Sequence, residues 1–163
     1  MATCKASVVV ATAKKQVGYK EGKNNWTKYA RDLDSVKYYT PQKKQNVAWC
    51  ATFKNWLIWI ASGKNKNFAQ SIQGQPHKNN LSAGVKYDAN YFRKIKRFYK
   101  TPKVADVIYF GKRGAETHEG IVSYKKGSII KTIEGNSGNA VKQHTYAVSN
   151  KKIVGYGRPK YTA

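Results

Sequence analysis

The sequence predicts an α+β fold in which helices come first and pack on an antiparallel β-sheet. Two observations support this. Before Pro102, apolar residues recur at helical spacing in several segments, whereas after it short β-rich runs alternate with turn signals. Helices followed by a run of strands are typical of α+β domains. No internal repeat, linker or compositional break is present, so residues 1–163 are predicted to form a single domain.

The first helix is predicted near the N-terminus. Val9, Val10, Ala13 and Val17 fall at i, i+1, i+4 and i+8, and Gly18 is a plausible stop. Its apolar stretch is too short, and the segment before that stretch carries too little positive charge, for a signal peptide. A second, short helical piece is expected around residues 26–33.

The strongest periodic signal lies at Trp49–Ala61, which carries an apolar face and further apolar residues on its other sides. Such a helix is predicted to be central and buried, ending at Gly63. A polar loop is expected over Lys64–Ser82, and a fourth helix over Val85–Ile95. The residues of the central apolar face are Trp49, Phe53, Trp56, Leu57 and Ile60.

Strands are predicted in the last third of the chain. Lys125-Lys126-Gly127 separates two β-rich runs and predicts a hairpin. The predicted strands are Val104–Phe110, Ile121–Tyr124, Ser128–Ile133, Gln143–Val148 and Lys152–Tyr156.

The chain is strongly basic, with 31 Lys+Arg against 8 Asp+Glu and a formal net charge of +23. Such a charge attracts polyanions, and composition alone makes nucleic-acid binding the first hypothesis. The longest apolar run, Trp56–Ala61, is far shorter than the ~20 residues of a membrane span. The two cysteines exclude a disulfide framework or a zinc ribbon, and Cys4 is expected to be a free, non-catalytic thiol.

Cys50 stands at the start of the central helix, where unpaired N–H groups and the helix dipole favour an anion. Cysteines in this position form thiolates more readily, and the same N–H groups can stabilise an oxyanion. The alternative is a small buried hydrophobic residue, which is a common role for free cysteine.

His118 precedes one predicted hairpin strand, and Glu134 ends the other. Because the start of one hairpin strand neighbours the end of its partner, the two side chains should lie close together. A carboxylate bonded to an imidazole fixes its tautomer and stabilises its charged form. The residues therefore indicate a Cys50–His118–Glu134 constellation, against the alternative that His118 is an ordinary loop histidine.

Four stretches resemble the CHAP domains, the cysteine, histidine-dependent amidohydrolase/peptidase domains of bacterial and phage cell-wall hydrolases. The ordered set covers nearly the whole chain, and an N-terminal segment around Tyr19-Lys20-Glu21-Gly22 is similar to that of endolysin-type members. The matching stretches are Trp49-Cys50-Ala51-Thr52-Phe53, Asp106-Val107-Ile108-Tyr109-Phe110, Thr117-His118-Glu119-Gly120-Ile121-Val122 and Thr132-Ile133-Glu134-Gly135-Asn136.

The resemblance implies a papain-like fold of the NlpC/P60-like superfamily. It makes Cys50 the nucleophile, His118 the general base and Glu134 the group that orients His118, with Asn136 as a fourth polar member. Trp49, which precedes the nucleophile, is considered as a wall of the cleft, the alternative being a position in the core. Gln45 or Asn46 is considered as a second oxyanion donor, in addition to the Cys50 N–H.

The chain departs from the family pattern in places. Glu119 stands where many members have an apolar residue, and by strand alternation it should point away from the His118 side. Ala105 replaces a frequent glycine. Some members bind calcium through an N-terminal acidic loop, but here only Asp32 and Asp34 are near, among lysines and Arg31. We therefore expect no metal and no other cofactor.

The predicted function is peptidoglycan hydrolysis at an amide bond by a thiol mechanism. The cleaved bond stays open between an N-acetylmuramoyl-L-alanine amide and a peptide bond. The expected partners are peptidoglycan and anionic wall polymers such as teichoic acid. We expect a monomer that does not bind nucleic acid and stays in the host cytoplasm until a membrane pore releases it. The alternatives are a non-enzymatic polyanion-binding domain and a degenerate CHAP fold that only binds the wall.

Overall fold

The computed structural model describes residues 1–40, 42–73 and 84–163. The amphipathic segment near the N-terminus forms α1, and the short segment after Trp26 forms α2. At the N-terminus of α2, the backbone N–H of Ala30 donates to the Thr27 hydroxyl, which caps the helix. The apolar segment forms α3, as predicted. The helices are α1 (Ala6–Gln16), η1 (Lys23–Asn25), α2 (Lys28–Ser35), α3 (Cys50–Ala61), α4 (Lys66–Gln73) and α5 (Val85–Lys94).

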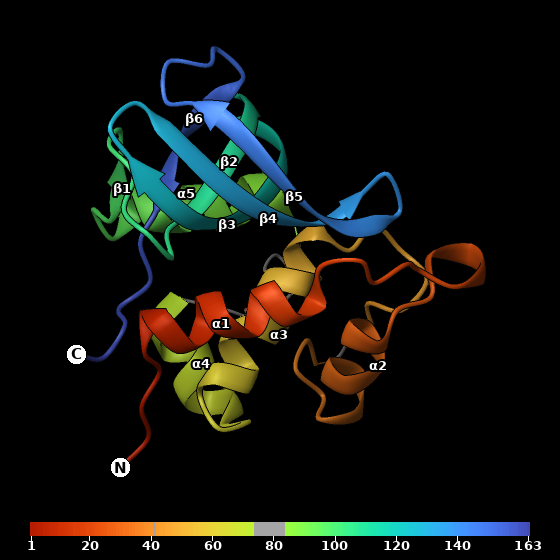
Figure 1. Ribbon diagram of the computed structural model, residues 1–163. Helices are drawn as coiled ribbons and strands as arrows, with labels where there is room; N and C mark the ends of the chain where they lie inside the picture. The colour runs from red at the N-terminus through yellow and green to blue at the C-terminus, as the bar shows by residue number, and fades with distance from the viewer. Residues whose placement is uncertain (41, 74–83) are drawn as a thin grey trace.

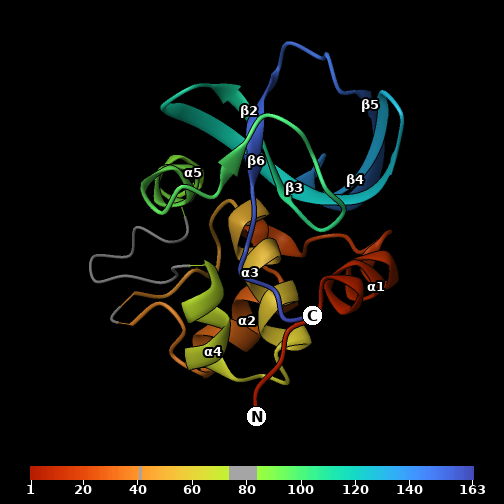
Figure 2. The same cartoon turned by 90° about the vertical axis from the view of Figure 1, so that its left-hand side faces the viewer.

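The strands form one six-stranded sheet in the order β1-β6-β2-β3-β4-β5, and every pairing in it is antiparallel. This confirms the predicted α+β class with an antiparallel sheet. Figures 1 and 2 show the sheet on one side of the molecule and α1 to α4 on the other. The strands are β1 (Phe98–Tyr99), β2 (Val107–Lys112), β3 (Ala115–Lys126), β4 (Ile129–Ser137), β5 (Ala140–Ala147) and β6 (Ile153–Gly157).

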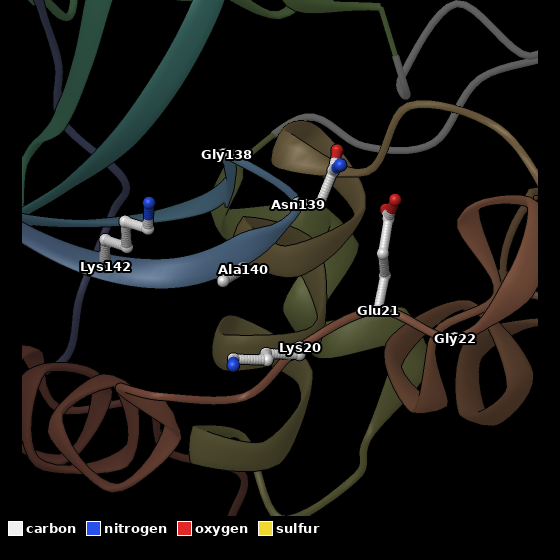
Figure 3. Close-up of a pocket in the computed structure, with 7 residues that line it drawn as sticks. All are labelled: Lys20, Glu21, Gly22, Gly138, Asn139, Ala140 and Lys142. Carbon is white, nitrogen blue, oxygen red and sulfur yellow. The ribbon is translucent and has the colours of Figure 1, made fainter.

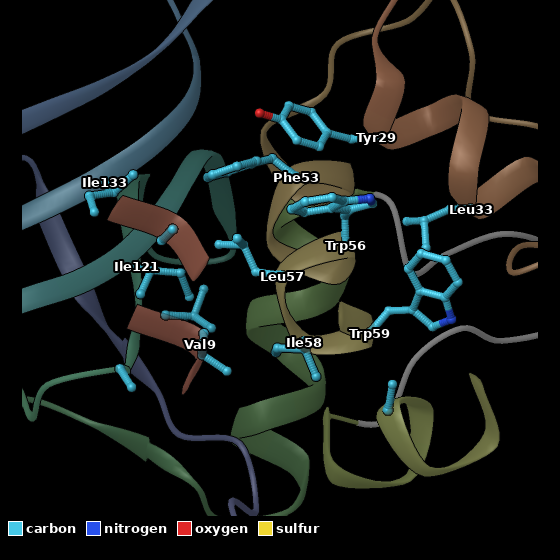
Figure 4. Close-up of a cluster of buried hydrophobic side chains, with 14 of the residues drawn as sticks. Val9, Tyr29, Leu33, Phe53, Trp56, Leu57, Ile58, Trp59, Ile121 and Ile133 are labelled. Carbon is cyan, nitrogen blue, oxygen red and sulfur yellow. The ribbon is translucent and has the colours of Figure 1, made fainter. Parts of the chain in front are cut away.

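Helix α3 is the centre of the main hydrophobic core. Ten of its residues, Cys50 to Trp59, are buried, and its apolar side chains pack with Ile121 and Ile133 of the sheet and with Val9 of α1 (Figure 4). A smaller cluster around Phe110, Val122 and Tyr156 forms a second core. Because α3 is covered on nearly all sides, its apolar character all round is explained by burial.

Several details differ from the sequence-based prediction. The expected loop over Lys64–Ser82 contains helix α4, in which Ala69 and Ile72 are buried; residues 74–82 of that loop lie outside the described residues. The two-residue strand β1 was not expected. Val17, which belongs to the apolar spacing of the first predicted helix, is 45% exposed.

The β3–β4 hairpin sets the geometry of the site. Its register pairs Ile121 with Ile133 and Val122 with Thr132, and the turn uses Gly127 with a φ of 59°. Glycine adopts this left-handed conformation without a steric penalty. No helix within the described residues is long and apolar enough to cross a membrane.

Candidate active site

Cys50 is the first residue of α3 and is 7% exposed. Trp49 occupies the N-cap position, and its side chain makes no capping hydrogen bond. The first-turn N–H groups are therefore not satisfied by the usual side-chain cap, and they can interact with an anion at this end of the helix.

His118 and Glu134 meet across the β3–β4 hairpin. His118 Nε2 lies 2.8 Å from Glu134 Oε1. The second oxygen of Glu134 accepts hydrogen bonds from the Thr132 hydroxyl and, at 2.9 Å, from the Tyr146 hydroxyl. Glu134 is 2% exposed, so these bonds stabilise a carboxylate that would otherwise be costly to bury.

The three side chains form an electrostatically coupled set. Burial by itself lowers the pKa of His118, but hydrogen bonds to Cys50 and Glu134 raise it to about 9. Burial raises the pKa of Glu134, but the bonds from His118 and Thr132 outweigh it, and the net shift is downward. At neutral pH the arrangement therefore favours an imidazolium between a carboxylate and the sulfur of Cys50.

Aromatic rings and a glycine shape the surroundings of His118. The Phe110 ring lies 5.8 Å from the His118 ring and 5.2 Å from the Tyr146 ring. A Cβ at Gly120 would stand 2.5 Å from Glu134 Cγ, so only glycine lets the carboxylate approach His118 as it does. The sequence analysis did not identify Thr132 or Tyr146. Thr132 could have been found because it lies two residues before Glu134, on the same face of β4.

Asn136 follows Glu134 at an irregular end of β4, where the pairing register with β5 shifts. It is half-buried and adopts a φ of 55°. Within the described residues its side chain makes no hydrogen bond, so the structure does not connect it to His118. Its role as a fourth polar member stays a prediction.

The three predicted substrate-binding residues have structural partners. Trp49 is fully buried, and its indole N–H donates to Glu21 Oε2 at 2.6 Å, so it supports the core instead of forming the expected cleft wall. The Gln45 amide is bonded at both ends to the backbone of Thr27. The Asn46 amide donates to the Asn24 carbonyl at 2.8 Å. Both amides hold the loop before α3 in place.

Lys54, Asp88 and Glu119 form a fully buried cluster. Lys54 Nζ lies 2.8 Å from Asp88 Oδ2 and 3.9 Å from Glu119 Oε2. Glu119 therefore points toward α3 and α5, whereas Gly120 faces Glu134, as alternation along a strand requires. Burial and then the Asp88 charge raise the pKa of Glu119 well above its usual range. A neutral Glu119 beside the Lys54–Asp88 pair leaves the cluster without net charge.

A pocket of about 510 Å³ lies between residues 20–22 and the β4–β5 turn. In Figure 3 the side chains of Glu21 and Asn139 project to the same side of adjoining backbone segments, which are joined by the Glu21 N–H to Asn139 carbonyl bond of 3.0 Å. Lys20 and Lys142 also line the pocket. The bond from Glu21 to Trp49 connects this pocket to the residue that precedes Cys50.

No group of His, Cys, Asp and Glu side chains suited to a metal ion occurs within residues 1–40, 42–73 and 84–163. The two aspartates considered for calcium bind other groups. Asp32 accepts from the Trp56 indole and pairs with Arg31, and Asp34 accepts from the backbone N–H groups of Lys44 and Gln45. Cys4 is a free, buried thiol.

Comparison with known proteins supports the fold. No family model matches the chain, and no curated protein matches it. The solved structure of Ly7917 is similar, with a TM-score of 0.56 and 14% sequence identity over 95% of this chain. The match spans 62% of the Ly7917 chain. At this identity the likeness concerns the arrangement of helices and strands.

Proposed function

We propose that this chain is a peptidoglycan hydrolase of the CHAP type, with a papain-like fold, that cleaves an amide bond of the bacterial cell wall. The observation that carries the proposal is the position of His118, which is bonded to Glu134 and lies close enough to Cys50 for the thiol to raise its pKa. A thiol at a helix N-terminus, a base and a carboxylate that orients the base are the parts that thiol-dependent acyl transfer requires. The ordered resemblance to CHAP motifs supports the same function.

In the acylation step, the Cys50 thiolate attacks the amide carbonyl and forms a C–S bond. The developing oxyanion is stabilised by N–H groups at the N-terminus of α3. His118 then transfers its proton to the nitrogen of the leaving amine, and the C–N bond breaks. The products of this step are a free amine and a thioester on Cys50, with His118 neutral.

In the deacylation step, neutral His118 accepts a proton from water as the water oxygen attacks the thioester carbonyl. The C–S bond breaks, a carboxylic acid leaves, and the thiolate–imidazolium pair is restored. Glu134 stabilises His118 whenever it is charged. Its own bonds to Thr132 and Tyr146 keep it in place through the cycle.

The pocket beside Glu21 is the proposed position of the peptide part of the substrate. Lys20 and Lys142 offer cations to peptide carboxylates, and Asn139 and Glu21 offer an amide and a carboxylate to backbone or amino groups. Peptidoglycan stems and cross-bridges carry all of these groups. The pocket is therefore suited to a polar peptide and less suited to an apolar ligand.

The proposal is tested on purified, insoluble peptidoglycan by following loss of turbidity. Cys50→Ala and His118→Ala should abolish clearing, and Glu134→Gln should slow it at least about 10-fold, because each removes a part of the acyl-transfer machinery. Circular dichroism verifies that the variants fold. Clearing by Cys50→Ala at the wild-type rate would refute the thiol mechanism, and no clearing by the wild-type chain would favour a chain that only binds the wall.

A further inference from the structure

Short strand β1 is flanked by pockets lined with cations. On one side, a pocket of about 310 Å³ is lined by Arg93, Lys96, Lys100 and Arg113, together with Phe98. Its lining contains no carboxylate. The residues come from the end of α5, from β1 and from the β2–β3 turn, so separate elements bring these cations together.

A second pocket, of about 510 Å³, is lined by Tyr99 on the other side of β1, and a third pocket of about 250 Å³ adjoins the second. They share Lys103 and Arg158, and Lys125 and Arg97 each line one of them. We name the cations of these three pockets the β1 basic track.

The β1 basic track has a large excess of positive charge. The carboxylates that contact its cations are Glu116, bonded to Arg93, and Asp106, bonded to Arg158, and both are buried. Eight cations thus stand against two carboxylates. Five other cations of the track make no ion pair within the described residues. They are Lys96, Lys100, Lys103, Arg113 and Lys125. An anion bound there would meet cations that are not already neutralised.

The two paired arginines are held in fixed positions. Arg93 lies over the Phe98 ring at 4.3 Å, and Arg158 lies over the Tyr99 ring at 3.8 Å. Phe98 and Tyr99 line pockets on opposite sides of β1. Each guanidinium is also bonded to a buried carboxylate, so little side-chain entropy is lost when it contacts an anion.

We propose that the β1 basic track binds a phosphodiester polymer of the cell wall, with successive phosphates in pockets on the two sides of β1. Spaced pockets match a repeating anion better than a single one. An arginine covers one face of each β1 ring and the Tyr109 ring stacks on Phe98, which reduces the ring surface on which a nucleic-acid base could stack. The choice of a wall polymer rests on the proposed function, whereas the anion site itself does not.

Polymer bound along the track would leave the candidate active site open. Cys50, His118 and Glu134 line none of the three pockets. The track would therefore hold the enzyme on the wall while the active site acts on a nearby peptide.

The test compares two variants with the same change in charge. Lys96→Gln/Lys100→Gln/Arg113→Gln removes cations of the track, and Lys14→Gln/Lys15→Gln/Lys151→Gln removes exposed lysines elsewhere. Co-sedimentation with purified Gram-positive walls is measured at about 50 and about 200 mM salt. The same walls stripped of phosphodiester polymer with hydrofluoric acid serve as the second substrate.

The track variant should bind native walls at least about 10-fold more weakly than the control variant, and its salt slope should fall by about 2. Binding of the wild-type chain should fall to a similar degree on stripped walls. Equal losses in both variants, or undiminished binding to stripped walls, would overturn the proposal. Binding is scored without hydrolysis, so a failure here is distinct from a failure of the proposed enzyme activity.

Competitors at equal phosphate concentration identify the type of polyanion. Poly(glycerol phosphate) should displace the wild-type chain from walls more effectively than duplex DNA or phosphatidylglycerol vesicles. Stronger competition by DNA would overturn the assignment in favour of nucleic acid, and stronger competition by vesicles would overturn it in favour of a membrane surface.

Discussion

His118 is the residue on which the proposed chemistry depends most, because it is bonded to the Glu134 carboxylate and its pKa is raised by both Glu134 and Cys50. Its side chain is 27% exposed, so water can reach it. The hydrogen bond to Glu134 fixes which ring nitrogen faces the carboxylate. The other ring position is then free to exchange a proton with the sulfur and with the leaving amine.

The pKa of His118 leads to a prediction for stability. Its folded-state pKa of about 9 lies above the ordinary value of 6.5. Its stabilising contribution should therefore be complete below pH 6.5 and be lost as pH rises through about 9. Urea unfolding between about pH 6 and about pH 10 should show this loss in the wild-type chain and a flatter profile in His118→Gln. Parallel profiles for the two proteins would contradict the assignment.

The sequence contained enough information to bring His118 and Glu134 together, because a hairpin fixes which strand ends are neighbours. It could not identify Tyr146, which reaches Glu134 from β5. That contact depends on the register of a third strand, and the register follows from packing that no local pattern encodes. Trp49 was misjudged for a related reason. Its position beside Cys50 suggested a cleft wall, whereas the aromatic cluster of Tyr19, Tyr29 and Phe53 draws it into the core.

At the scale of elements, α3 links the nucleophile to the core. Cys50 begins the helix, and one turn later Lys54 enters the buried cluster with Asp88 of α5 and Glu119 of β3. Tyr109 of β2 also donates to Asp88 at 2.6 Å, and Gln73 of α4 accepts from Lys54 at 2.8 Å. This cluster joins the helix that carries Cys50 to the strand that carries His118.

Substitutions in the cluster should differ sharply in how much they lower the free energy of unfolding. Lys54→Met leaves the buried Asp88 carboxylate without its ammonium partner and should lower the free energy of unfolding by about 3–5 kcal/mol. Glu119→Gln should cost less than about 1 kcal/mol, because a neutral side chain replaces another. Urea denaturation gives both values, with exposed Lys15→Met as the control. A cost below about 1 kcal/mol for Lys54→Met would show that the pair does not matter for stability.

Helical periodicity was sufficient to predict α1, α3 and α5, and turn signals were sufficient to predict the β3–β4 hairpin. Helix α4 was missed because its segment is polar and only Ala69, Ile72 and Gln73 are buried in it. Strand β1 has two residues and exists by pairing with β6, which a local pattern cannot reveal. Strand β3 begins at Ala115, earlier than predicted, because polar residues near its start are stabilised by pairing with β2.

At the scale of the whole molecule, the charges behind the net charge of +23 are unevenly distributed between the core and the surface. The acidic residues of the core and the candidate site are buried and paired, as with Glu134, Asp88, Glu116 and Asp106. The surface is therefore even more basic than the composition suggests. Such a surface favours association with an anionic wall.

This charge predicts salt-dependent association. Binding of the wild-type chain to purified walls should weaken steeply between about 50 and about 200 mM salt, because exposed charges are screened within about 10 Å at the middle of that range. Co-sedimentation measures the bound fraction directly. Binding that stays constant over the range would mean that apolar or shape contacts hold the chain on the wall.

The central claim is that Cys50, His118 and Glu134 cleave an amide bond of peptidoglycan. Mass spectrometry of the fragments released from a defined wall tests it most directly. We predict fragments with a new amine and a new carboxyl group at one type of amide bond, intact glycosidic bonds, and no such fragments with Cys50→Ala. Cleaved glycosidic bonds, or the same amide products from Cys50→Ala, would contradict the claim.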